Sequence, residues 1–136
     1  MHTTNYTSTF IEVAPDSVAE EPRVPPERGG KPTVALMQFR MLNDHPYEYT
    51  SDDVVFTVFA ERQGIARDEW AEQREAYFSV GRACLRSSDL GKRYGWGIHF
   101  DEQGRAAVYG VGTEEYQRLI ADDSVKKLKA MRSKRA

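Results

Sequence analysis

Alternating large and small or polar side chains predict three β-strands in this chain of 136 residues. Residues 5–14 carry β-branched side chains at positions 7, 9, 11 and 13, which is the period of a strand. Residues 94–100 alternate large apolar side chains with glycine and histidine. A turn at 101–104 then leads to a return strand over 105–111. We therefore expect a hairpin near 94–111, with the N-terminal strand added to it.

Apolar side chains spaced three or four positions apart predict helices in two parts of the chain. Three lie between the first strand and the hairpin, over 34–43, 50–62 and 67–79. After the hairpin, one helix begins at Thr113 and a basic helix follows over 124–136. Strands and helices do not alternate regularly, as they would around a parallel sheet. The pattern predicts an α+β fold, a small antiparallel sheet packed with about five helices.

A proline-rich segment at 15–32 separates the first strand from the first helix. It holds five of the six prolines, together with Gly29-Gly30. Because proline removes backbone donors and resists helix formation, we expect an extended arm that runs over the surface. The length and the hydrophobic content of 40% are enough for one core. The chain is therefore expected to be a single domain over residues 1–136.

The charge is unevenly distributed. The net charge is −2, yet six of the last eleven residues are basic and none is acidic. One interpretation is that the predicted basic C-terminal helix docks on its own acidic domain, with its cations at the negative end of the helix dipole. The other is that it binds phosphates, most simply those of nucleic acid. Self-docking is favoured, and nucleic-acid binding remains the alternative.

Composition narrows the class of protein. No run of about 18 apolar residues occurs, which gives no candidate for a membrane span. The first residues lack the basic and apolar regions of a signal peptide, and the one cysteine, Cys84, excludes an intrachain disulfide. We therefore expect a soluble, cytoplasmic protein.

The densest group of ligand-binding side chains surrounds the start of the hairpin. Lys92 and Arg93 are adjacent cations, and a guanidinium can hold two oxygens of a phosphate or carboxylate. Trp96, His99 and Tyr47 would add a flat wall and polar contacts to such a site. The neighbouring glycines would let a ligand approach the backbone. Alternatively, they only make room for packing, and the arginines stay solvated.

Candidate catalytic residues are fewer. Cys84 would need a base such as His99 or His45 within hydrogen-bond reach to act as a nucleophile. No protease or oxidoreductase signature surrounds it, and single cysteines are most often small buried hydrophobes. No pair of histidines has metal-ligand spacing, so no metal site is predicted.

Several segments of the sequence, taken together, resemble one protein family. They are Thr4–Tyr6 with Thr9–Ala14, His45–Val54, Leu90–His99, Tyr109–Val111 with Glu114–Tyr116, and Lys129–Arg135. In this order they resemble a family of small uncharacterised bacterial and fungal proteins, a domain of unknown function. The resemblance implies one stand-alone domain in a bacterial cytoplasm and brings no reaction, cofactor or catalytic residue.

These observations favour a domain that binds a small ligand or partner and holds an anion. The alternatives are a nucleic-acid-binding protein that acts through the basic C-terminal helix, or an enzyme that uses Cys84 or a histidine base. The cofactor is left unassigned. The aromatic faces of the strands also leave a homodimer open.

Overall fold

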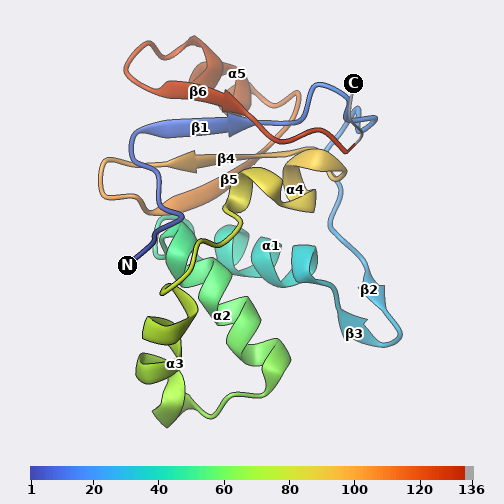
Figure 1. Ribbon diagram of the computed structural model, residues 1–136. Helices are drawn as coiled ribbons and strands as arrows, with labels where there is room; N and C mark the ends of the chain where they lie inside the picture. The colour runs from blue at the N-terminus through green and yellow to red at the C-terminus, as the bar shows by residue number, and fades with distance from the viewer. Residues whose placement is uncertain (134–136) are drawn as a thin grey trace.

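The computed structural model describes residues 1–133, and its centre is a mixed sheet of four strands in the order β5-β4-β1-β6. The strands are β1 (Thr9–Glu12), β4 (Trp96–Phe100), β5 (Ala106–Gly110) and β6 (Lys126–Lys129). β1 is antiparallel to β4 and parallel to β6. The predicted sheet of an N-terminal strand and a hairpin is confirmed, and β6 extends it on the far side of β1 (Figure 1).

Five α-helices among residues 1–133 complete the fold, as the α+β interpretation predicts. They are α1 (Val34–Asp44), α2 (Ser51–Gln63), α3 (Trp70–Tyr77), α4 (Asp89–Lys92) and α5 (Glu114–Ala121). α1 and α2 lie below the sheet and α5 lies above it in Figure 1. No helix among residues 1–133 is long and apolar enough to cross a membrane.

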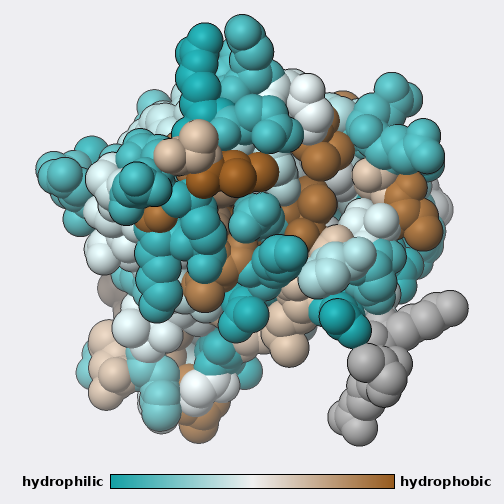
Figure 2. Space-filling model, turned by 90° about the horizontal axis from the view of Figure 1, so that it is seen from above, coloured by the Kyte–Doolittle hydropathy of each residue, from teal (hydrophilic) through white to brown (hydrophobic). Residues whose placement is uncertain are grey.

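The register of the sheet explains why both of its faces are covered. One row of paired residues runs Leu128, Ile11, Ile98 and Val108, and it belongs to the main core with α1 and α2. Because side chains alternate between faces, the next row, which includes Phe10 and His99, faces α5. Seen from above, the surface on that side is mostly hydrophilic around a smaller hydrophobic area (Figure 2).

The chain after α5 is a strand, not the basic helix predicted for 124–136. Lys126 bonds to Ser8 and Ala130 to Glu12 through the backbone, so β6 pairs along β1. The helical prediction rested on Val125, Leu128 and Met131, but Met131 is exposed. The strand instead places Leu128 and Ala130, two positions apart, against the core. The tail therefore docks on its own domain as an edge strand; Lys134 and Arg135 lie outside the described residues.

The proline-rich segment at 15–32 forms no helix, and it ends in a small hairpin that is absent from the predicted elements. Pro22 lies against Gly110, and the Glu21 carbonyl lies over Gly95, where a Cβ would come within 2.8 Å of the oxygen. β2 (Glu27–Arg28) and β3 (Lys31–Pro32) pair around Gly29-Gly30. Both glycines have positive φ, as a tight two-residue hairpin turn requires.

Candidate functional site

A cationic cleft lies between the β2–β3 hairpin, the end of α2 and the end of α4. Four basic side chains line this cavity of about 420 Å³: Arg28, Lys31, Arg62 and Arg93. Asp89 also lines it and is 3.7 Å from the Arg93 guanidinium. Within residues 1–133, Arg28, Lys31 and Arg62 take part in no ion pair. The cleft thus keeps an excess of positive charge.

The hairpin holds two of these cations side by side. Arg28 and Lys31 are direct partners in the β2–β3 register, and like charges opposite each other destabilise a strand pair. Thr33, which caps α1 and also lines the cleft, bonds through its hydroxyl to the Pro26 carbonyl. This bond ties the hairpin to the start of α1, so the two cations are held at the cleft. An anion between them would relieve their repulsion.

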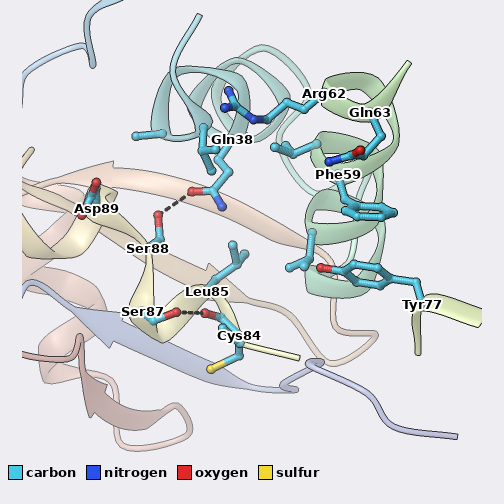
Figure 3. Close-up of a pocket in the computed structure, with 15 residues that line it drawn as sticks. Gln38, Phe59, Arg62, Gln63, Tyr77, Cys84, Leu85, Ser87, Ser88 and Asp89 are labelled. Atoms are coloured by element: carbon cyan, nitrogen blue, oxygen red, sulfur yellow. Dashed lines mark hydrogen bonds between the residues drawn. The ribbon is translucent and has the colours of Figure 1, made fainter. Parts of the chain in front are cut away.

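An apolar chamber of about 410 Å³ continues from the cationic cleft, and Val34, Ala35, Arg62 and Asp89 line both. Its wall is largely apolar and comes from α2, α3 and the 3₁₀ turn Leu85–Ser87 (Figure 3). Besides Val34 and Ala35, the apolar and aromatic members are Val55, Val58, Phe59, Tyr77, Ala83 and Leu85. The cavity is partly open to solvent and also has polar groups in its wall, and its size is that of a small-molecule site.

Gln38 of α1 is a buried polar side chain of the chamber, with 8% of its surface exposed. The Ser88 hydroxyl donates to its Oε1 over 2.6 Å and accepts from the Leu90 amide. Ser88 caps α4, so the capping residue also orients the Gln38 amide. In Figure 3 the amide nitrogen points away from Ser88, toward the space above Leu85. Within residues 1–133 this nitrogen makes no hydrogen bond to the protein, and because no buried side-chain nitrogen or oxygen there lacks a partner, it is open to solvent in the cavity.

Among the predicted site residues, Tyr47 and His99 come together, away from the cleft. The Tyr47 hydroxyl lies 2.8 Å from His99 Nδ1 and 2.6 Å from the Tyr109 hydroxyl. Tyr47 has a φ of +60°, a strained conformation for a bulky residue. Its amide bonds to the Ala106 carbonyl on the outer edge of β5. This loop therefore covers the edge of the sheet and places the tyrosine over His99.

The other predicted residues are spread over the molecule. Arg93 lines the cleft, whereas Lys92 does not appear in its lining among the described residues. Trp96 donates from Nε1 to the Arg23 carbonyl and packs on Phe39. His45 pairs with Glu48 at 3.1 Å beside a separate cavity of about 260 Å³.

Cys84 lies at the chamber, but its thiol points away from the interior (Figure 3). The Sγ atom is 3.1 Å from the Tyr6 hydroxyl. Burial, and then the contact with Cys84, raise the pKa of Tyr6 to about 12. Tyr6 is therefore protonated near neutral pH and does not act as a base for the thiol. Within residues 1–133, no hydrogen bond joins Cys84 to His45 or His99.

Burial lowers the pKa of His99 from 6.5, against the opposing effect of Asp101 and Asp122. The unfolded chain therefore binds more protons than the native protein below about pH 6.5. We expect the stabilisation by neutral His99 to be complete above this pH and to be lost as the pH falls through 6.5 toward the native pKa. Urea unfolding between pH 5 and 8 tests this, because His99→Gln should flatten the dependence. An unchanged dependence in His99→Gln would contradict the assignment.

The residues that the sequence analysis missed are mainly those of the cleft. Arg28, Lys31 and Arg62 have no local motif, and Gln38 resembles any polar position of a helix. A signal did exist for the hairpin, because Gly29-Gly30 flanked by cations fits a tight turn. Tyr109 could also have been found, since the register of the predicted hairpin places it opposite Gly97, beside His99.

The fold and the cleft define the class of protein: a small α+β domain with a mixed four-stranded sheet and a cationic cleft that opens into an apolar chamber. The chain belongs to the DUF6157 family, a family of unknown function, which matches residues 1–136. The resemblance to a domain of unknown function is thereby confirmed. Comparisons with curated proteins and with solved structures each found no match.

Proposed function

We propose that this protein binds a small anionic ligand in the cationic cleft. The observation that carries the proposal is the convergence of four basic side chains from three separate segments on one cavity, with one acid among them. In a chain with a net charge of −2, such a cluster sets a local field that attracts anions. Arg93, predicted as an anion-binding residue, is part of it.

The backbone of the cleft adds to this field. The first turn of α1 contains no acidic residue, and two of its residues, Val34 and Ala35, line the cleft. Unpaired amides at the start of a helix carry partial positive charge. Guanidinium groups supply the stronger interaction, because they can hold two oxygens of one carboxylate or phosphate.

Inorganic phosphate is a direct probe of this site. We expect phosphate to shift the backbone NMR signals of Val34, Ala35 and Asp89 at constant ionic strength. The double variant Arg62→Gln/Arg93→Gln should weaken phosphate binding by at least about tenfold, because it removes two charge-assisted contacts. The signal shifts, followed over a phosphate titration, give the dissociation constant of each protein.

Lys92→Gln is the matched control, because it removes one positive charge beside Arg93 but outside the described lining of the cleft. It should keep most of the phosphate affinity. Shifts scattered over the whole surface, or equal affinity in the double variant and the native protein, would rule out the cleft as an anion site.

The other hypotheses have less support. Nucleic-acid binding relied on a basic C-terminal helix, and residues 126–129 form a strand instead. Catalysis by Cys84 needs a base, and the recorded polar partner of the thiol is Tyr6. We therefore propose no second function; a homodimer stays a prediction.

A further inference from the structure

A bound phosphate would account for the cationic cleft but not for the apolar chamber beside it. A phosphate held by the cationic cleft would leave the neighbouring chamber of about 410 Å³ unfilled. Arg62 and Asp89 line both cavities, so one molecule can extend from the charged end into the apolar end. Burial of an apolar group there would add to the affinity in proportion to its area.

Gln38 provides a polar contact inside this apolar chamber. Its Oε1 accepts from the Ser88 hydroxyl, and its amide nitrogen points into the chamber (Figure 3). This donor is accessible from the cavity, so a ligand with an acceptor oxygen there would replace water as its partner. A carbonyl oxygen is such an acceptor, whereas an aliphatic chain is not.

We infer that the ligand is an amphipathic anion: an apolar acyl or aryl group in the chamber, a carbonyl oxygen that accepts from Gln38, and a carboxylate or phosphate at the arginines. This inference rests on the proposed function and narrows it. Each part of the ligand has its own counterpart in the protein. The apolar group meets the wall around Phe59, the carbonyl oxygen meets the amide of Gln38, and the anionic group meets the cations around Arg62.

Hippurate is a suitable probe, since it joins a benzoyl group, an amide carbonyl and a carboxylate. N-acetylglycine keeps the carbonyl and the carboxylate but lacks the aryl ring. We expect hippurate to bind at least about tenfold tighter than N-acetylglycine, because the ring is buried in the chamber. Isothermal titration calorimetry or NMR titration of the full chain measures both constants, and the methyl ester of hippurate tests the need for the charge.

Two variants with the same chemical change isolate the role of Gln38. Gln38→Glu keeps an acceptor for the Ser88 hydroxyl and replaces the donor that faces the chamber. Gln63→Glu makes the same change at an exposed position of the lining. We expect Gln38→Glu to weaken hippurate binding by at least about tenfold more than Gln63→Glu does. Circular dichroism verifies that both variants are folded.

The outcomes separate this inference from the proposed function. Phosphate binding that depends on the arginines, with hippurate no tighter than N-acetylglycine, would overturn the inference and leave the anion site in place. Equal losses in Gln38→Glu and Gln63→Glu would remove Gln38 from the site. Loss of all binding, phosphate included, would overturn both proposals.

Discussion

Replacement of Gly97 by alanine is expected to destabilise the protein by about 2 kcal/mol or more. A Cβ at this position would lie 2.5 and 2.7 Å from two ring atoms of Phe10 and 2.8 Å from Tyr116. Real Cβ contacts are essentially never below 3.0 Å, so a ring or a strand has to move. The backbone at Gly97 is not in the left-handed region, so the expected effect comes from packing alone.

Neither ring can move without cost. Phe10 is fully buried and Tyr116 is 3% exposed, and their rings meet edge to face at 4.9 Å between centroids. The Tyr116 hydroxyl also accepts from the Val13 amide over 2.9 Å. A shift of Tyr116 would therefore break a hydrogen bond that joins α5 to the end of β1. Gly97→Val should be worse still, because two more methyl groups meet the same rings.

Urea unfolding of the variants measures this effect, with Gly81→Ala as the control. Gly81 has only one atom near its Cβ position, His2 Nδ1 at 3.8 Å, and no positive φ. Its replacement should change the free energy of unfolding by less than about 0.5 kcal/mol. If Gly97→Ala were as stable as Gly81→Ala, the close packing of α5 on β4 would be wrong.

Elements with local signals could be predicted well from the sequence. α2 begins where Thr50 and Asp53 form a reciprocal capping box, and Gly64 ends it in the left-handed conformation; all three residues are visible in the sequence as typical cap residues. The β4–β5 hairpin follows from alternation around a turn. The glycines near the start of the hairpin are predicted to make room for packing or for a ligand, and Gly97 of β4 makes room for the rings of Phe10 and Tyr116.

Elements that depend on partners far away in the sequence could not be predicted in this way. β6 shows a helical spacing of apolar residues, but β1 offers an open edge, and the gain from pairing with it decides the structure. The cleft also depends on residues that are far apart in the sequence. Arg28, Arg62 and Arg93 come from distant parts of the chain, and only the packing of the hairpin, α2 and α4 around α1 brings them together.

The structure also shows why the predicted site residues divided into two groups. Tyr47 and His99 lie on the α5 side of the sheet, whereas Arg93 lies at the end of α4 on the other side, beside α1 (Figure 1). The sequence places His99 only six residues after Arg93. Arg93 ends α4, before strand β4 begins. Within β4, alternation sends Trp96 toward Phe39 of α1 and His99, three positions later, to the opposite face. Proximity in the sequence was therefore a poor guide to a shared site.

The second large effect is expected at Asp52, where Asp52→Ala should lower the free energy of unfolding by about 2–4 kcal/mol. Oδ1 accepts from the amide and the hydroxyl of Thr4 over 2.6 and 2.7 Å, and Oδ2 accepts from the Thr3 hydroxyl over 2.7 Å. The Asp52 amide in turn donates to Asn5 Oδ1. The carboxylate thus fastens the segment before β1 to the first turn of α2.

Asp52→Asn separates the hydrogen bonds from the charge. The amide keeps one acceptor oxygen for Thr4 and can donate to the Thr3 hydroxyl. Its expected loss is about 1 kcal/mol, close to the value of a charge at a helix N-terminus. Asp68→Ala removes an exposed acid from the first turn of the next helical segment and is the control for a general charge effect; it should cost less than about 0.5 kcal/mol.

Urea unfolding ranks the three variants, and hydrogen exchange locates the effect. Thr4 is 5% exposed and Ser51 is fully buried, and their hydroxyls are 2.8 Å apart. When the carboxylate is removed, the Thr4 amide loses its acceptor inside the protein, so its exchange should accelerate more than that of the β4 amides. Equal stability of Asp52→Ala and Asp52→Asn would show that only the charge at the start of α2 contributes. Faster exchange at Thr4 with β4 unchanged would instead show that Asp52 holds the N-terminal segment on α2, and that the sheet folds without this contact.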